Sequence, residues 1–381
     1  MSNISEYTKC SNCGACYNVC PVSAISVKSD RLFYTIEVDN NKCVDCGICS
    51  EVCPVNNPQN MTSVISSYAG YSVDANVVKN SSSGGAFYEL ANIVLADSGV
   101  VFAAAYSDDY SEVIFKSTDE VPLCTLMKSK YVESCVGLSF QKIKAELETG
   151  REVMFCGAPC QVAGLKKYLK KEYPNLLTCD FSCGGMPSHT MYKEYLSDIK
   201  KRLKSPIASV DFRPKVYGWQ LHTVKIAAKN SQKYIKPAIQ DPYFHSFVIS
   251  HISTRDYCLQ CEFTDNHYSD IILADFWKFK SASRLPDNDT GLSLMITTTE
   301  QGEKFIERIR KRFVLTILDN DKATYNLKNK SYSDEFLKKR SVFISKCSES
   351  GFMNAVKDVK LESALKPKVK YYVKKVLRVI R

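Results

Sequence analysis

Two cysteine-rich runs near the N-terminus limit what this chain can fold into more than any other feature. Residues 10–21 read CSNCGACYNVCP and residues 43–54 read CVDCGICSEVCP. Each is C-x2-C-x2-C-x3-C followed by proline, the run that holds 4Fe–4S clusters in bacterial ferredoxins. Two zinc knuckles are the alternative, but zinc sites are built from separate C-x2-C hooks rather than four cysteines in one run. The repeated run therefore predicts a ferredoxin-like module.

The order of the cysteines also predicts which of them share a cluster, because in ferredoxins the fourth cysteine of each run ligates the cluster of the other run. One 4Fe–4S cluster is expected on Cys10, Cys13, Cys16 and Cys53. The second is expected on Cys43, Cys46, Cys49 and Cys20. Gly14 and Gly47 are expected to let the backbone approach the sulfide ions. We expect this domain to span residues 1–60, since N-N-P-Q-N around Pro58 is typical of a linker.

Composition favours metal binding over disulfides. The chain has 381 residues and 17 cysteines, and its first thirty residues are polar, so no export signal is expected. No apolar run reaches the length of a membrane span. Because thiolate-ligated clusters need a reducing compartment, we expect a cytoplasmic protein. The net charge is +10, but the excess is concentrated in residues 354–381, so nucleic acid is not expected as a partner.

Residues 61–350 alternate between strand-like and helix-like stretches, which predicts a larger α/β domain and an α+β or α/β chain overall. Strands are expected at 100–106, 152–156, 175–181, 221–228, 270–275 and 292–298. Helices are expected at 84–97, after residues 157–161, after Ser188 as the N-cap, and from about 300 to 312.

The segment S81-S-S-G-G85 precedes the first of these helices. Small hydroxyl residues and glycines at a helix N-terminus can present backbone N–H groups to a phosphate or pyrophosphate. The alternative is a well-capped helix without a ligand. Neither G-x-G-x-x-G nor G-x4-G-K-[ST] occurs, so a nucleotide would not be held in a standard Rossmann or P-loop manner.

Four further cysteines have suggestive surroundings. Cys160 lies in the loop G-A-P-C-Q after a strand, Cys183 lies in C-G-G-M-P-S after another, and Cys258 and Cys261 form a C-x-x-C. Loops at the carboxyl ends of strands converge in an open α/β sheet, so these thiols could form a third cluster site. A redox-active pair or free thiols are the alternatives. The remaining cysteines are expected to be small core or surface residues: Cys124, Cys135, Cys156, Cys179 and Cys347.

Taken together, these motifs resemble the beta subunit of coenzyme F420-reducing hydrogenases and dehydrogenases. The resemblance extends to about residue 350. It rests on the ferredoxin module and on S-S-G-G (82–85), K-S-K-Y-V (128–132), G-A-P-C-Q-V-A-G-L-K (157–166), C-G-G-M-P-S (183–188), R-x-x-C-x-x-C (255–261) and A-D-F-W (274–277). It implies an iron–sulfur flavoprotein with bound FAD. Many bacterial proteins of this kind are associated with polysaccharide biosynthesis.

The resemblance also assigns residues. It implies that Ser82, Ser83, Gly84 and Gly85 hold the FAD pyrophosphate, that Lys130 and Tyr131 contact the flavin, and that Cys160, Cys183, Cys258 and Cys261 hold a third 4Fe–4S cluster. Two departures stand out. The family's C-H-G is C-G-G at residues 183–185, and its G-T-P-C has Ala158 in place of the hydroxyl residue. These changes leave the thiols intact but weaken the case for F420 as the redox partner.

The implied function is an oxidoreductase that takes low-potential electrons from a donor, such as a ferredoxin or a reductase, and passes them through clusters and FAD to a small-molecule substrate or a deazaflavin. The alternative is a non-catalytic electron-relay subunit that serves a partner enzyme. No acid–base pair stands out. Asp275 and Trp277 are catalytic candidates from their place at a strand end, although an aspartate that ends a strand beside a packed indole would look the same.

The C-terminal tail, residues 351–381, is basic and amphipathic. Its apolar positions fall on one helical face: Val369, Tyr372, Val373, Val376, Leu377 and Ile380. Such a helix could associate peripherally with an anionic membrane, on its cytoplasmic side, or could pack on the body of the protein.

Overall fold

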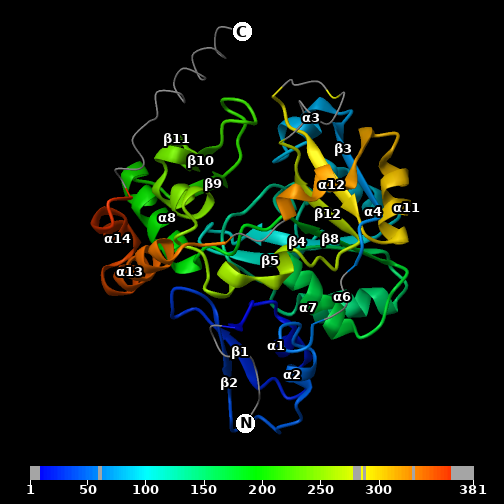
Figure 1. The fold of residues 1–381 in the computed structure, drawn as a ribbon, viewed down its shortest axis with the longest axis horizontal. Coiled ribbons are helices and arrows are strands. Elements are labelled where there is room, and N and C mark those ends of the chain that lie inside the picture. The colour runs from blue at the N-terminus through cyan, green and yellow to red at the C-terminus, as the bar shows by residue number, and fades with distance from the viewer. Residues whose placement is uncertain (1–8, 59–61, 278–284, 286–288, 328–330, 362–381) are drawn as a thin grey trace.

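The computed structural model describes residues 9–58, 62–277, 285, 289–327 and 331–361. It is a mixed α/β protein in which an N-terminal ferredoxin-like domain lies against a larger domain built on a mixed sheet, as Figure 1 shows. The predicted fold class is confirmed. Within the described residues, no helix is both long and apolar enough to span a bilayer.

The N-terminal domain consists of two short helices and a two-stranded antiparallel sheet. These elements are α1 (Ala15–Val19), β1 (Ile25–Lys28), β2 (Thr35–Val38) and α2 (Ile48–Glu51). Each cysteine run turns through a left-handed glycine at the start of its helix, with φ 90° at Gly14 and 74° at Gly47. Only glycine adopts this conformation without strain. A Cβ on Gly14 would also lie 2.2 Å from Cγ2 of Val136, so this glycine serves the contact with the larger domain as well.

A nine-stranded sheet, counted over the described residues, forms the centre of the larger domain, in the order β14-β3-β13-β12-β8-β7-β4-β5-β6. Its strands are β3 (Ser66–Ser72), β4 (Val100–Tyr106), β5 (Val113–Ser117), β6 (Ser134–Cys135), β7 (Val153–Cys156), β8 (Leu176–Phe181), β12 (Ile271–Asp275), β13 (Ser293–Thr297) and β14 (Phe313–Leu318). The strands β12, β8, β7 and β4 run parallel. Their carboxyl ends therefore meet at one edge, where ligands bind in open α/β sheets.

Helices cover both faces of this sheet. On one face lie α4 (Ala86–Ala96) and α11 (Glu300–Ile309), which share an apolar core with the strands. On the other face lie α6 (Ser139–Glu148) and α7 (Pro159–Leu169), which in Figure 1 stand between the sheet and the N-terminal domain. Residues of α1 are buried in one core with α6 and α7, so the two domains share a continuous apolar interior.

A third layer flanks the sheet edge. Its strands are β9 (Ile207–Asp211), β10 (Thr223–Ala228) and β11 (Lys233–Pro237), and its helices are α8 (His189–Leu203), α13 (Asp334–Ser350) and α14 (Phe352–Asp358). The Ser188 side chain caps α8 by accepting a hydrogen bond from the Met191 N–H, as predicted. Helix α14 belongs to the same core as α8, so the tail begins with a packed helix. The predicted amphipathic stretch after Pro367 lies outside the described residues.

The remaining helical elements are short. They are α3 (Ala75–Lys79), α5 (Leu123–Leu126), α9 (Pro242–Phe244), α12 (Asn320–Ala323), 3-10 turns at Ala238–Gln240, Tyr257–Gln260, Glu262–Thr264 and Thr324–Leu327, and a π-helical turn at His245–Ile249. The expected strands and helices recur within a few residues of their predicted bounds, but the last helix ends at Ile309 rather than near 312 because β14 begins at Phe313.

Candidate functional site

The structure brings seven of the eight N-terminal cysteines, all except Cys43, together in a crossed arrangement. The pKa of the Cys13 thiol is raised to about 12, chiefly by burial and also by the nearby Cys53 and Cys10 thiols. Burial also raises the pKa of Cys10 and of Cys16, and Cys53 is a further group that raises both. The pKa of Cys49 is raised by burial and also by the Cys46 and Cys20 thiols. We name these sets the Cys10 group (Cys10, Cys13, Cys16, Cys53) and the Cys43 group (Cys43, Cys46, Cys49, Cys20).

The four dispersed cysteines also converge, although three separate segments carry them. The pKa of the Cys160 thiol is raised by burial and then by Cys261, Cys183 and Cys258. We name this set the Cys160 group (Cys160, Cys183, Cys258, Cys261). Cys160 itself was expected in a loop, and that prediction is wrong: Pro159 already begins α7, so Cys160 occupies its first turn. Proline favours this position because its missing N–H has no partner there anyway.

The Cys10 and Cys160 groups lie side by side across the domain boundary. Besides burial and the thiols of its own group, Cys13 also raises the pKa of Cys160. The Cys160 Sγ lies 3.7 Å from the Ser11 carbonyl oxygen. Among the described residues, no three His, Cys, Asp or Glu side chains are placed to ligate a single metal ion. A cubane spreads its thiolates around eight atoms rather than one.

Backbone amides point at several of these sulfur atoms. The N–H groups of Asn12, Ala24 and Gly185 donate to Sγ of Cys10, Cys20 and Cys183 at 3.4, 3.2 and 3.4 Å. Such donors favour the thiolate, which is the form that ligates iron. Amides directed at cluster sulfur are also one of the means by which proteins adjust cluster potentials. The donor set of each group therefore fits a 4Fe–4S cluster.

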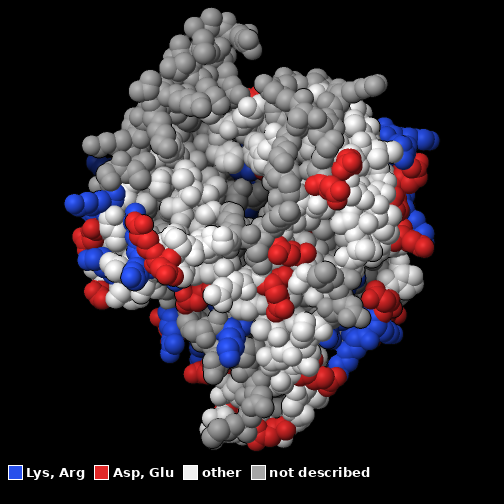
Figure 2. All heavy atoms as spheres, in the orientation of Figure 1, with Lys and Arg blue, Asp and Glu red and all other residues white. Residues whose placement is uncertain are grey.

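A cavity of about 560 Å³ lies at the carboxyl ends of the parallel strands. Its wall includes Cys183 and Cys258, so it borders the Cys160 group. The opposite wall includes Ser81–Ser83 and Lys128–Val132. Figure 2 shows a hollow on the face viewed, with Lys or Arg atoms deep inside it. The volume lies within the range for small-molecule and cofactor sites.

Lys130 and Tyr131 both line this cavity, but each is already engaged by the protein. The Lys130 ammonium donates to the carbonyl oxygens of Leu126, Met127 and Lys128 at 3.2, 2.7 and 3.2 Å. Burial lowers the pKa of Lys130 to about 7. The Tyr131 ring packs against three phenylalanines: Phe212, Phe244 and Phe247. Its hydroxyl accepts from Arg213 at 3.3 Å.

Some of the backbone N–H groups at the helix start, Ser82–Gly85, already have hydrogen-bond partners within the protein. The Ser293 hydroxyl accepts from the N–H groups of Gly84 and Ala86 at 3.0 and 3.4 Å. A Cβ on Gly84 would lie 2.4 Å from the Gly70 carbonyl oxygen, so the neighbouring strands by themselves already require glycine there. Ser82 and Ser83 also bond within the protein, to Ser129 and to the Leu292 carbonyl.

One polar atom at this wall has no protein partner. The Ser81 hydroxyl is buried and lacks a hydrogen bond within the described part of the chain. Buried polar groups are almost always paired in native proteins, so an orphan at a cavity wall suits a polar ligand. Together with the basic wall and the cavity volume, this hydroxyl fits a phosphate-bearing flavin.

Asp275 and Trp277 line the cavity, and both are held by a cluster of side chains. Arg213 donates to the Asp275 carboxylate at 2.8 Å, and the Trp219 indole N–H donates at 3.4 Å. Trp277 stacks on Trp219 with ring centroids 4.3 Å apart. Arg213 was not predicted, because a single arginine in D-F-R-P carries no pattern that marks it.

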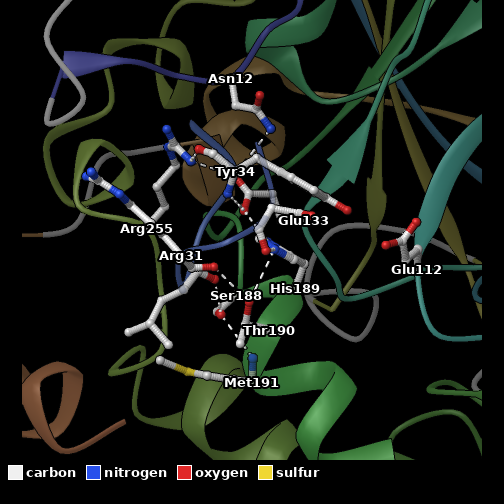
Figure 3. A network of polar contacts seen from close by, with 12 residues as sticks. Asn12, Arg31, Tyr34, Glu112, Glu133, Ser188, His189, Thr190, Met191 and Arg255 are labelled. Carbon is white, nitrogen blue, oxygen red and sulfur yellow. Dashed lines mark hydrogen bonds and ion pairs between the residues drawn. The ribbon is translucent and has the colours of Figure 1, made fainter. Parts of the chain in front are cut away.

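A buried polar network joins the two domains, and Figure 3 shows it from close by. Its centre is the Glu133 carboxylate, whose side chain is 0% exposed. Glu133 accepts from Arg255 at 2.7 Å and from the Tyr34 N–H at 3.0 Å. Asn12 and His189 contact the same carboxylate at 3.3 Å each. The motif R-x-x-C-x-x-C drew attention to Arg255, whereas Glu133 was missed.

Two family matches follow the same division of the chain. Residues 9–57 match the 4Fe-4S dicluster domain, which, with the converging thiols, defines an iron–sulfur protein of the electron-transfer type. Residues 150–323 match the family described as the C terminus of the coenzyme F420 hydrogenase/dehydrogenase beta subunit. Over this region the chain is similar to that family.

Comparison with solved structures finds a similar chain in the xenon-derivatised F420-reducing NiFe hydrogenase complex from Methanosarcina barkeri. The two are 14% identical, the similarity covers 79% of this chain and 92% of that chain, and the TM-score is 0.42. A comparison with curated proteins finds no match.

Proposed function

We propose that this protein carries electrons singly along three 4Fe–4S clusters to an FAD site, from which an organic substrate or a deazaflavin is reduced. The succession of thiol groups carries the proposal. Cys46 is exposed at the outer end of the N-terminal domain. The Cys10 group follows, the Cys160 group touches it through Ser11, and Cys183 and Cys258 reach the cavity wall.

In this proposal each group holds one cluster, and the two domains divide near residue 60. The protein contributes thiolates, amide donors to sulfur and a shared apolar interior that keeps water from the middle site. Because Cys13 and Cys160 are buried in one apolar core that spans the domain boundary, the separation of the two inner groups is set by packing rather than by a linker.

FAD is proposed for the 560 Å³ cavity. When bound, a flavin converts single electrons into the pairs that most organic reductions need. Ser81 would donate a hydrogen bond to its phosphates, Lys128 and Lys130 would supply positive charge, and Tyr131 would present an aromatic edge. Ser82, Ser83, Gly84 and Gly85 remain in the proposal as the wall beside the phosphates.

A relay subunit without its own substrate chemistry is the second candidate, and one observation favours it. The Asp275 carboxylate is bound by Arg213 and Trp219, which suits a structural role better than proton transfer. The matched family is also described as a subunit, so a partner enzyme would then complete the reaction.

Anaerobic purification tests the proposal. Three clusters give about twelve irons per chain, whereas the N-terminal domain alone gives about eight. One non-covalent FAD per chain is expected with the twelve irons. Steady-state turnover of a small molecule by the isolated chain then separates the enzyme from the relay. Eight irons and no flavin in reconstituted protein would contradict the proposal.

A further inference from the structure

We infer that the buried Arg255–Glu133 ion pair sets the reduction potentials of the two cluster sites on either side of it, the Cys10 and Cys160 groups. The inference rests on the proposed function, because it requires clusters at both groups. Arg255 and Glu133 are positioning residues, since they would act through the cysteines rather than on a substrate.

Arg255 is in bonding contact with both groups. Its side-chain Nε donates to the Cys10 carbonyl oxygen at 2.8 Å. Its own carbonyl oxygen accepts from the Cys258 N–H at 3.1 Å, at the start of the C-x-x-C turn. One residue thus fixes the first cysteine of one group and the third of the other. Figure 3 shows its guanidinium directed at Glu133.

Both charges are withdrawn from water, with side chains 2% and 0% exposed. Charges in such surroundings act over longer distances than surface charges, because solvent and salt do not screen them. Their effect on the thiols has opposite signs. Burial raises the pKa of Cys10 and of Cys258, Arg255 lowers both, and Glu133 raises both. The pKa of Cys49, in the remote Cys43 group, responds to burial and to Cys46 and Cys20.

The same signs apply to reduction. When one electron leaves the cluster at the Cys10 group, that site is oxidised by one unit and the site at the Cys160 group is reduced by one; no proton or other group moves. The arriving electron adds negative charge, so Arg255 raises a site's potential and Glu133 lowers it. The pair therefore sets the reduction potentials of the two neighbouring sites, whereas the potential of the Cys43 site depends on other groups.

The test is Glu133→Gln in the anaerobically purified full chain. The amide keeps an oxygen acceptor for Arg255, and arginine stays charged without its counter-charge. Both adjacent sites should then become easier to reduce. A unit charge acting over about 12 Å through an effective dielectric constant of about 20 changes an equilibrium about tenfold. For one electron a tenfold change is about 59 mV, measured by a redox titration followed by electron paramagnetic resonance.

Two variants make the measurement specific. Glu152→Gln is the matched control, because Glu152 pairs with Arg308 on the far edge of the sheet and should leave all potentials unchanged. Arg255→Lys keeps the charge but loses the forked geometry, so its potentials should stay near those of the wild type. Signals are assigned with Cys258→Ser and Cys46→Ser, which remove the Cys160 and Cys43 sites in turn.

The inference is overturned if Glu133→Gln retains its iron and moves neither adjacent site, or moves the Cys43 site equally. Should that variant lose iron, Arg255→Lys decides: unchanged potentials support the charge effect, and a shift overturns it. A wild-type protein with about eight irons and no third cluster signal in electron paramagnetic resonance would contradict the proposed function instead.

Discussion

The backbone of Gly164 in α7 lies directly against the side chain of Cys13. A Cβ atom on Gly164 would lie 2.9 Å from Cβ and 3.0 Å from Sγ of Cys13. Real side chains do not pack so closely, so a glycine in the larger domain allows the first cysteine run to approach Cys160, four residues earlier in the same helix. The distance between the Cys10 and Cys160 groups therefore depends on the absence of one methyl group.

Replacing this glycine should loosen the docked domain. In Gly164→Val, α1 must move away from α7, at a cost of about 1 to 3 kcal/mol for overpacking. Amide hydrogen exchange of Ala15–Val19 should become roughly five to 150 times faster. Lys167→Val, on the same helix, is the control and should not change it. Equal protection in both variants would mean that α1 docks independently of this contact.

Removing one thiol of the Cys160 group should remove a third of the iron. Cys258→Ser is expected to lower the content from about twelve to about eight irons per chain and to leave the ferredoxin-type resonance signals in place. Flavin reduction by dithionite should also slow. Cys124→Ser is the control, because Cys124 is exposed on α5. An iron content near eight per chain in both the wild type and Cys258→Ser would mean that the C-x-x-C is a thiol pair.

Filling the cavity should displace FAD without touching the iron. Ala104 of β4 lines the cavity, and Ala104→Phe would occupy part of its volume. We expect FAD content to fall from about one per chain to a small fraction, with iron unchanged. Ala145→Phe makes the same substitution at an exposed position of α6 and should retain flavin. Full flavin in Ala104→Phe would move the FAD site elsewhere.

FAD affinity should fall as pH rises through about 7. Burial lowers the pKa of Lys130 to about 7, so its ammonium is charged below that pH and neutral above it. The FAD phosphates favour the charged form, which is lost on the alkaline side. A charge contribution of about 0.5 to 1 kcal/mol corresponds to a roughly two- to fivefold weaker Kd at pH 8.5 than at pH 6.

Flavin fluorescence quenching measures this pH step. Lys130→Met should reduce it. Lys215→Met is the comparison, because burial also lowers the pKa of Lys215 to about 7 and it lies at the Ser83 carbonyl. A step that survives unchanged in both variants belongs to another group.

The tail gives a prediction from sequence alone. We propose that the basic residues after Pro367 bind anionic membranes, each contributing up to about 1 kcal/mol. Deleting residues 366–381 should abolish sedimentation with anionic liposomes at low salt and leave the absorbance spectrum unchanged. The membrane hypothesis fails if the full-length protein stays in the supernatant. High salt serves as the internal control.

Local patterns predicted much of the fold. The spacing of the cysteine runs acts within a dozen residues, and the strands from Val100 and Val153 are continuous apolar runs. The strand β3 was missed because S-S-Y-A-G-Y-S is rich in serine and glycine, which are poor strand formers. It is nevertheless buried between β13 and β14, where a Cβ on Gly70 would lie 1.9 Å from the Val314 carbonyl oxygen.

The site was less predictable because its contacts join distant residues. Arg213 meets Asp275 and Arg255 meets Glu133 across 62 and 122 positions, and no periodicity relates such pairs. The strand contact of Gly84 was missed for the same reason. Its neighbour is the backbone of β3, which becomes visible only when the strand order is known.

The contacts that hold the N-terminal domain against the larger domain can form only after much of the chain has been synthesised. Asn12 forms a hydrogen bond with Glu133, which is synthesised 121 positions later. The Cys10 carbonyl accepts from Arg255, which is synthesised 245 positions later. A chain emerges from the ribosome N-terminus first, at about 5 to 20 residues per second. The two cysteine runs are therefore solvent-exposed for many seconds before any residue that docks them exists. Iron insertion into these runs can thus precede docking. A chain that ends before residue 255 would lack Cys258 and Cys261, so its N-terminal domain would lie beside an incomplete Cys160 group.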